Sequence, residues 1–171
     1  MDVPRLETDR LVLRAHCPAD FHECLRLWSN ENVTKYITGR PSTSEEVWGR
    51  ILRYSGHWEL LGYGYFLVED KFNQALVGEV GIAHYHRDAL TSFGEPPEAG
   101  WALLPRYQGL GLAREALTTV LSWAEKKGLR KTTCRIDPRN LASIKLAKRL
   151  GYEKYDEVTV GDLQSVLLQR G

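Results

Sequence analysis

The stretch RYQGLGLAREAL, residues 106–117, places two glycines two positions apart directly before a run of good helix formers. The residues before it, EAGWALLP at 98–105, are typical of a strand that ends at a proline. This order predicts a strand, a glycine turn and a helix from about Gly109 to Lys127. Glycine admits positive φ, and the first four amides of a helix have no partner within it. Such amides suit an anion such as a phosphate.

The glycine turn differs from the two best-known phosphate-binding loops. The pattern GxxxxGK[ST] fails because no Lys-Ser or Lys-Thr pair follows the glycines. The pattern GxGxxG, counted from Gly109, would need a third glycine where the chain has Arg114. By itself, the turn is therefore either a phosphate-binding turn or an ordinary compact connection between a strand and a helix.

Composition predicts one soluble domain over residues 1–171. The chain is 43% hydrophobic and 26% charged, with a formal net charge of +1. This near-balance of charge argues against a nucleic-acid partner, which usually requires a basic excess. We see no apolar run long enough to span a membrane and no signal peptide, so we expect a cytoplasmic protein with no membrane partner.

The cysteines and histidines predict neither a disulfide scaffold nor a metal site. The three cysteines, Cys17, Cys24 and Cys134, form no CxxC pair, which fits a reducing compartment. The five histidines show no HExxH motif, so we expect no metal cofactor. Cys134 falls in a predicted buried strand, and no His or Asp partner indicates that it is a nucleophile.

Hydrophobic periodicity predicts an alternating order of strands and helices. Strands are expected at 10–15, 62–70, 75–86, 98–105, 131–137, 152–160 and 162–169, and a loop at 89–97. Helices are expected at 18–30, 41–58, 109–127 and 140–150. Thr43 and Glu46 form a possible capping box, and Asn140 is a candidate N-cap. The order predicts an α/β (α+β) domain with one central mixed sheet and helices packed against it.

In this setting the glycine turn resembles the acetyl-CoA signature of a known family. The run EAGWALLPRYQGLGLAREAL, followed later by NLASIKLAKRLGY at 140–152, resembles the GNAT superfamily of acyl-CoA-dependent N-acetyltransferases. Gln108 to Ala113 fits the family pattern Q/R-x-x-G-x-G/A. A second register starting at Arg106 also matches, but the later one leaves Ala113 at the helix start. LETDRLVLRAHCPAD and PSTSEE are similar to the ribosomal-protein (Rim-type) branch.

The resemblance implies a single-domain GNAT fold and a set of residues that bind acetyl-CoA. The fold has about six to seven strands and about four helices, with a splayed parallel strand pair that holds acyl-CoA. That pair would be 98–104 and 131–137. Main-chain groups of Leu103 and Leu104 would meet pantetheine and the thioester. Asn140 would reach the pantetheine arm, alone or in addition to its role as N-cap. The pyrophosphate would be held by the turn residues Gln108, Gly109, Leu110, Gly111, Leu112 and Ala113.

The resemblance also implies two catalytic residues. Glu98 matches the family's strand glutamate and would take the proton from the acceptor amine, directly or through water. Ser143 would protonate the leaving thiolate, because the position where many members carry a tyrosine is Ala147 here. His84 and His86 alternate on the preceding strand and are further candidates for proton relay. The alternative for Glu98 is a solvated carboxylate at a strand end, and the alternative for Ser143 is a solvent-facing helical serine. The two histidines would otherwise be ordinary surface residues.

The activity that follows is transfer of acetyl from acetyl-CoA directly to a primary amine. The acceptor would be the N-terminal α-amine of a protein or a small-molecule amine, and the enzyme a monomer or homodimer without a metal. The missing tyrosine leaves an alternative, a GNAT-like module that binds acyl-CoA without catalysis.

Overall fold

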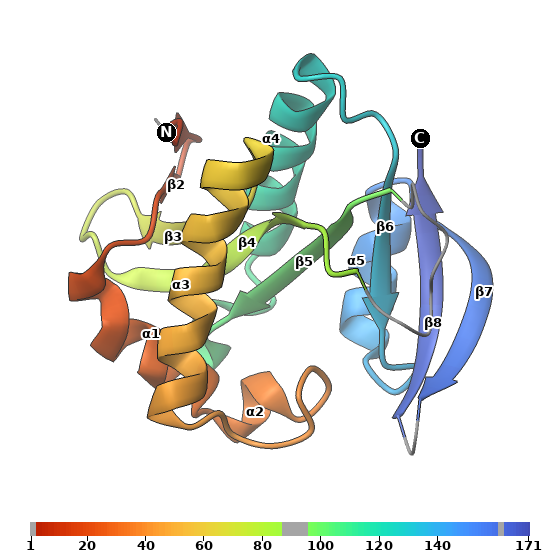
Figure 1. Cartoon of the computed structure of the whole chain (residues 1–171), viewed down its shortest axis with the longest axis horizontal. Coiled ribbons are helices and arrows are strands. Elements are labelled where there is room, and N and C mark those ends of the chain that lie inside the picture. The colour runs from red at the N-terminus through yellow and green to blue at the C-terminus, as the bar shows by residue number, and fades with distance from the viewer. Residues whose placement is uncertain (1–2, 87–95, 161–162) are drawn as a thin grey trace.

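The structure, a computed structural model, describes residues 3–86, 96–160 and 163–171. These residues form one sheet of eight strands in the order β1-β2-β3-β4-β5-β6-β8-β7 (Figure 1). Neighbouring strands are antiparallel except β5 and β6, which are parallel. The strands are β1 Leu6–Glu7, β2 Leu11–Arg14, β3 Tyr65–Asp70, β4 Leu76–Ala83, β5 Glu98–Leu103, β6 Thr132–Ile136, β7 Glu153–Val160 and β8 Leu163–Arg170.

Helices cover both faces of the sheet. They are α1 Phe21–Trp28, α2 Glu31–Thr34, α3 Ser44–Leu61, α4 Leu112–Lys126 and α5 Leu141–Arg149, with 3₁₀ turns η1 Pro18–Asp20 and η3 Pro105–Tyr107. Leu67 of β3 packs with residues of α1 and α3, whereas Phe66 and Val68 pack with residues of α4. Because successive strand residues face opposite sides, α1 and α3 cover one face and α4 covers the other (Figure 1).

The predicted fold class is confirmed: the chain is an α+β domain with one mixed sheet and one parallel strand pair. The strand and helix numbers predicted from periodicity were slightly too low. β1 has two residues and α2 has four, and neither is long enough to produce a periodic pattern. Residues 89–95 of the predicted loop lie outside the described residues.

Helix α3 begins where the sequence predicted it. The Glu46 N–H donates to Thr43 Oγ1 at 3.3 Å, and the Thr43 N–H donates to Glu46 Oε2 at 2.8 Å, which confirms the capping box. The helix buries one stripe of side chains against the sheet, namely Val47, Ile51, Tyr54 and Trp58. This burial fixes the rotation of α3 and therefore where its remaining side chains point.

Helix α4 starts later than predicted. Residues Pro105–Tyr107 form a 3₁₀ turn, and Gly109 and Gly111 then adopt φ of +76° and +79°. These left-handed conformations favour glycine, and they delay the first helical residue to Leu112. Among the helices that the structure describes, none combines the length and apolarity needed to cross a membrane.

Candidate functional site

The parallel strands β5 and β6 are joined at one end and separate toward the other. Glu98 pairs with Thr133, and the Thr133 N–H donates to the Pro97 carbonyl at 3.0 Å. From this junction the two strands diverge, as Figure 1 shows. Main-chain groups that would normally pair across a parallel sheet therefore face a gap.

The register of β5 against β4 shows which main-chain groups face the gap. The Leu104 N–H donates to the Val77 carbonyl at 3.0 Å. Since antiparallel residues alternate between pairing with a neighbour and pointing away from it, the main chain of Ala99, Trp101 and Leu103 points toward β6.

The end of β5 is tied to the turn that follows it. The Gln108 Nε2 donates to the Leu103 carbonyl at 2.8 Å, and the Tyr107 N–H donates to the Leu104 carbonyl at 2.9 Å. Leu104 thus uses both its main-chain groups within the fold, while the Leu103 N–H points into the gap. Gln108 holds the turn on the strand, a role that sequence reasoning did not assign to it.

The N-terminus of α4 lies directly after this turn and carries no side-chain cap. Gly111 is its N-cap residue and has no side chain to accept from the first amides. Arg10 braces the turn, since its Nη1 donates to the Leu110 carbonyl at 3.0 Å and its Nη2 pairs with Glu115 at 2.6 Å. The amides of Leu112 and Ala113 and the positive helix end form the kind of site that binds a phosphate.

A cavity of about 340 Å³ lies where β5 and β6 separate, and it is lined by residues 98–101 of β5 and 134–136 of β6. It collects residues from β5, β6, β8, α3, the start of α5 and the segment after α2. Three predicted site residues, Glu98, Asn140 and Ser143, line it together. The structure therefore brings the predicted acid, base and pantetheine contact to one cavity, and it places the predicted pyrophosphate turn at the other end of β5.

Ser143 is held by two neighbours inside this cavity. The Ser143 N–H donates to Asn140 Oδ1 at 3.1 Å, so Asn140 is indeed the N-cap of α5. The Trp101 Nε1 donates to Ser143 Oγ at 3.2 Å. Because the indole is donor only, the Ser143 hydroxyl hydrogen is left to point elsewhere, as a proton donor requires.

Tyr65 of β3 passes over Gly81 of β4 and reaches Gly100 of β5 beside the cavity. A Cβ on Gly100 would lie 1.9 Å from the Tyr65 Oη, so only glycine leaves room for this phenol. Tyr65 stacks on Tyr54 with ring centroids 4.6 Å apart. Burial raises the pKa of both phenols well above the usual range. The cavity wall therefore contains a Tyr65 hydroxyl that stays protonated.

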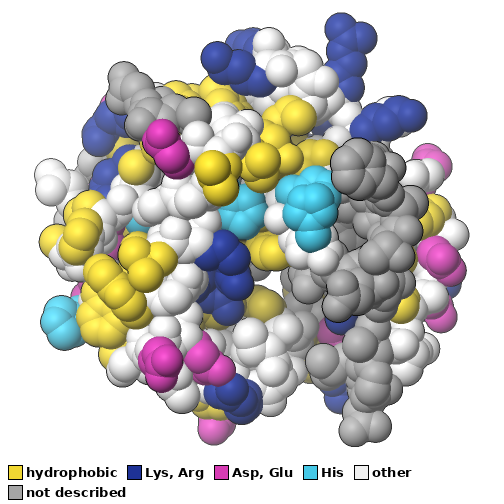
Figure 2. All heavy atoms as spheres, in the orientation of Figure 1, with side chains coloured by type: hydrophobic (Ala, Val, Ile, Leu, Met, Phe, Trp, Pro, Cys, Tyr) yellow, Lys and Arg dark blue, Asp and Glu magenta, His cyan; other side chains and the backbone are white. Residues whose placement is uncertain are grey.

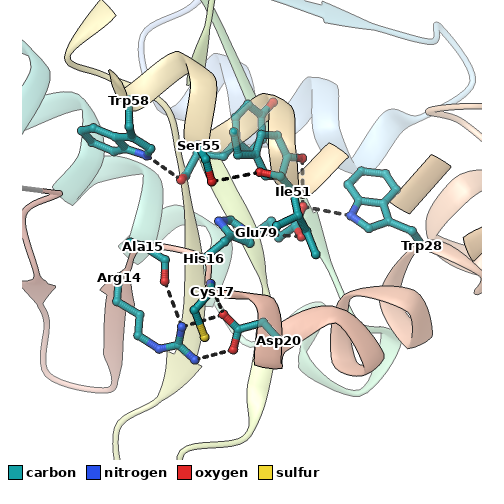
Figure 3. Close-up of polar contacts among 12 residues, drawn as sticks. Arg14, Ala15, His16, Cys17, Asp20, Trp28, Ile51, Ser55, Trp58 and Glu79 are labelled. Atoms are coloured by element: carbon teal, nitrogen blue, oxygen red, sulfur yellow. Dashed lines mark hydrogen bonds and ion pairs between the residues drawn. The ribbon is translucent and has the colours of Figure 1, made fainter. Parts of the chain in front are cut away.

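A buried carboxylate, Glu79 in β4, organises the residues behind this wall (Figure 3). Its Oε2 accepts from Trp28 Nε1 and from Tyr54 Oη, both at 2.9 Å. Its Oε1 lies 3.2 Å from His16 Nε2. Trp28 and Tyr65 both line the cavity, so Glu79 fixes one wall residue directly and the other through Tyr54.

Cys24 completes this buried group. Ligand atoms of His16, Cys24 and Glu79 lie within 4.8 Å of one another. Burial and the charge of Glu79 raise the pKa of the Cys24 thiol far above its ordinary value, whereas metals bind the thiolate. The Glu79 oxygens already have Trp28, Tyr54 and His16 as partners. We interpret the group as a buried ion pair beside a neutral thiol.

The other residues singled out from the sequence lie nearby. Cys134 lines the cavity, but burial raises its pKa to about 12, so it is a neutral thiol and a weak nucleophile. Strand β4 ends at Ala83, so His84 and His86 follow the strand and do not alternate on it as predicted, although their rings lie 4.2 Å apart. The His84 carbonyl lies 3.0 Å from His57 Nε2.

Sequence reasoning missed Glu79, Arg50 and Arg53. Glu79 interrupts the apolar run LVGEVGIA at the centre of a strand whose residues are all buried. A lone carboxylate in such a run is a usable signal, because buried charges require partners. Arg50 and Arg53 gave no comparable signal, since isolated arginines on a helix are usually solvated.

Comparison with known proteins agrees with this architecture. A family model described as an acetyltransferase (GNAT) domain matches residues 10–153. Over 173 residues, the chain is 27% identical to the uncharacterized N-acetyltransferase YoaA of Bacillus subtilis (strain 168). This alignment covers 98% of this chain and 90% of YoaA. The chain belongs to the GNAT family and is an N-acetyltransferase.

Solved structures share the whole fold. A protein from Bordetella pertussis, provisionally assigned to the GnaT family of acetyltransferases, superimposes with a TM-score of 0.86 at 30% identity and covers 98% of this chain and 99% of that one. RimL, a ribosomal L7/L12 α-N-protein acetyltransferase in complex with coenzyme A, superimposes with a TM-score of 0.78 at 15% identity and covers 98% and 97%. This second likeness shows the fold alone.

Replacing Glu79 by Gln removes the negative member of a buried ion pair, so we expect a loss of about 3 kcal/mol in the free energy of unfolding near neutral pH. Burial raises the Glu79 pKa, but the contacts with His16, Trp28 and Tyr54 outweigh it, so the pKa lies below its ordinary 4.5. A lowered carboxyl pKa stabilises the fold above the unfolded value, and this contribution disappears as the pH falls through the folded value.

Denaturant unfolding of wild type and Glu79→Gln from about pH 7 to about pH 3 tests this. The difference between their free energies of unfolding should become smaller in acid. Glu153→Gln, at an exposed position of β7, is the matched control and should change stability by less than about 0.5 kcal/mol. A difference in the free energy of unfolding that is the same at all pH values would contradict the ion pair.

Proposed function

We propose that the enzyme transfers acetyl from acetyl-CoA directly to a primary amine, with no covalent enzyme intermediate. The observation that carries the proposal is the order of features along β5: the cavity at Glu98, the main chain of Trp101 and Leu103 that points toward β6, and the uncapped N-terminus of α4. Glu98 and Ser143 both line that cavity. An anion site and an acid–base pair thus lie at opposite ends of one strand.

Acetyl-CoA fits this order of features as a substrate. Its pyrophosphate would meet the amides that follow Gly111, which form an anion site. Its pantetheine would pair with the outward main chain of Trp101 and Leu103, as an added strand does. The Leu103 or Trp101 N–H would also be aimed at charge that develops on the thioester oxygen, a contribution of about 3 kcal/mol in other enzymes.

The proton transfers fall to two side chains. The acceptor amine arrives mostly protonated, since an α-amine has a pKa of about 8 and a lysine about 10.4. Glu98 would take this proton, directly or through water, and the neutral amine would attack the thioester carbon. As the carbon–sulfur bond breaks, the thiolate would take a proton from Ser143, and the second proton that the nitrogen releases as the amide forms would return to Ser143 through water. Cys134 remains outside this sequence because it is a buried neutral thiol.

The acceptor is an N-terminal α-amine or a small-molecule amine. The RimL likeness supports the first through the fold alone, and membership of the Rim-type branch remains a prediction. A panel of amines and N-terminal peptides, read by CoA release, tests the activity. CoA release with some of the amines supports transfer. CoA binding measured by calorimetry, with no CoA release across the panel, would favour the module without catalysis.

Gly111→Val is expected to raise the Kd for CoA by at least about tenfold. A β-branched residue at a φ of +79° is strained by roughly 1–2 kcal/mol or more, so the turn would move. A Cβ at this position would lie 3.6 Å from the Arg10 Nη2, which braces the turn. Calorimetry with CoA measures the effect.

Gly128→Val is the matched control for strain, because Gly128 follows α4 at its far end with a φ of +88°. Its affinity for CoA should stay at the wild-type value. Unchanged affinity in Gly111→Val, or an equal loss in both variants, would refute the phosphate role of the turn.

Glu98→Gln is expected to lower kcat by about 10²-fold and to remove the acidic limb of the pH–rate profile, because an amide accepts no proton. The Kd for CoA should remain unchanged. The profile is measured by CoA release with an accepted amine. Glu153→Gln is the control, and an unaltered limb in Glu98→Gln would clear Glu98 of the role of base.

Ser143→Ala is expected to lower kcat by about 10²-fold with CoA binding intact, because the leaving thiolate loses its proton donor. Ser122→Ala, at an exposed position of α4, is the control and should retain wild-type kcat. Steady-state kinetics with one amine measures both, and wild-type turnover in Ser143→Ala would end the assignment.

A further inference from the structure

The cavity around Glu98 carries more positive than negative charge. Basic side chains reach it from three parts of the fold, and two acidic side chains lie among them. The basic residues are Lys35, Arg50, Arg53, Arg135 and Arg139, and the acidic ones are Glu98 and Asp137. Figure 2 shows the hollow near the middle of this face, with basic side chains on its α3 side.

One ion pair among the described residues removes part of this excess. Asp137 pairs with Arg139, with Arg139 Nη2 at 2.6 Å from Asp137 Oδ2. After that pair is set aside, Lys35, Arg50 and Arg53 line the cavity with Glu98, and the Arg135 Nε donates to Ser165 Oγ at 3.0 Å. Glu98 is also the residue proposed to meet the amine. The described lining of the cavity therefore has more basic side chains than acidic ones.

Arg50 and Arg53 are the central members of this group. They lie three residues apart on α3, so they project from one side of the helix. The Arg50 Cζ lies 3.6 Å from the Trp28 ring centroid, and the Arg53 Cζ lies 5.7 Å from that of Tyr85. The Arg50 Nε is buried without a hydrogen-bond partner. Stacking thus holds the two guanidinium groups in place. Burial alone would lower the pKa of Arg50, but Arg50 also interacts with the Tyr54 hydroxyl and with the charge of Glu79, which raise its pKa.

The aromatic residues of the cavity do not offset this charge for a cationic ligand. The ring of Tyr36 has Lys35 Nζ at 4.9 Å and Arg139 Cζ at 5.8 Å from its centroid. Trp28 and Tyr85 are covered by Arg50 and Arg53. Three of the rings that line the cavity, those of Trp28, Tyr36 and Tyr85, therefore already hold the protein's own cations, and a second cation at these rings would be repelled.

We propose that the acceptor is an amine that also carries an anionic group, a carboxylate in the simplest case, bound by Arg50 and Arg53. The proposal rests on the proposed function, since it places the amine at Glu98. A guanidinium binds a carboxylate through two parallel hydrogen bonds, which orients as well as attracts it. A cavity of about 340 Å³ has room for an acceptor of the size of an amino acid.

The direct test compares acceptors that differ by one carboxylate. The pairs are tyrosine with tyramine and tryptophan with tryptamine, with spermidine as a cationic reference. Peptides with an N-terminal Asp-Glu or Lys-Lys sequence separate a free amino acid from a protein N-terminus as the source. We expect kcat/KM to be at least about tenfold higher for the anionic member of each pair, a difference of about 1.4 kcal/mol. Equal values, or a preference for tyramine, tryptamine or spermidine, would overturn the proposal.

Failure of this proposal is distinguishable from failure of the proposed function. If CoA is released with tyramine and spermidine but not with the anionic amines, the enzyme transfers acetyl and the acceptor proposal is wrong. If no amine is turned over, transfer itself fails. Calorimetric titration of each pair into the CoA-saturated protein then decides the acceptor question, since tighter binding of the anionic member supports it and equal binding overturns it.

Variants of the two arginines test their role separately. Arg50→Gln and Arg53→Gln should raise KM for the anionic acceptor about tenfold, leave KM for its decarboxylated partner unchanged, and leave the Kd for CoA unchanged. Arg130→Gln, exposed and remote from the cavity, is the charge-matched control. Arg53 is the more exposed of the two, so its variant keeps the test valid if Arg50→Gln fails to fold. An equal rise in KM for both acceptors, or a higher Kd for CoA, would overturn the assignment.

Discussion

The separation of β5 from β6 is the constraint on which the rest of the site depends. A parallel pair normally satisfies its main-chain groups by mutual hydrogen bonds. Here the pair is joined at Glu98 and Thr133 and then opens, so the outward main chain of Trp101 and Leu103 needs another partner. The Gln108 side chain provides one for the Leu103 carbonyl. The remainder of the gap is suited to a strand-like substrate such as pantetheine.

A buried charge supports the opposite side of the same cavity. Glu79 is fully buried, and it is stabilised there because Trp28 and Tyr54 donate to its Oε2 and His16 Nε2 lies 3.2 Å from its Oε1. These partners also fix the aromatic wall on which Arg50 stacks. The interactions that hold the core of β4, α1 and α3 together therefore also position the Arg50 guanidinium at the cavity.

Much of this organisation was predictable from the sequence, and the exceptions have physical causes. The glycine turn, the capping box of Thr43 and the N-cap of Asn140 are local signals, because each depends on residues within one turn of chain. Glu98, Asn140 and Ser143 share a cavity as the family pattern implied. The assembly of Arg50 with Trp28 depends on how α3 is rotated against α1, which is a tertiary fact without a local signature. The register of β5 with β4 likewise decides that the main chain of Leu104 bonds to β4 and that the main chain of Leu103 points toward β6.

Backbone NMR during a CoA titration tests the central claim most directly, because it reports on the gap and on the anion site at once. The account predicts that the largest amide shifts occur at Leu112 and Ala113 after the turn and at Trp101 and Leu103 in β5, saturating together with one affinity. Saturable binding of CoA that leaves these four amides unchanged would contradict it.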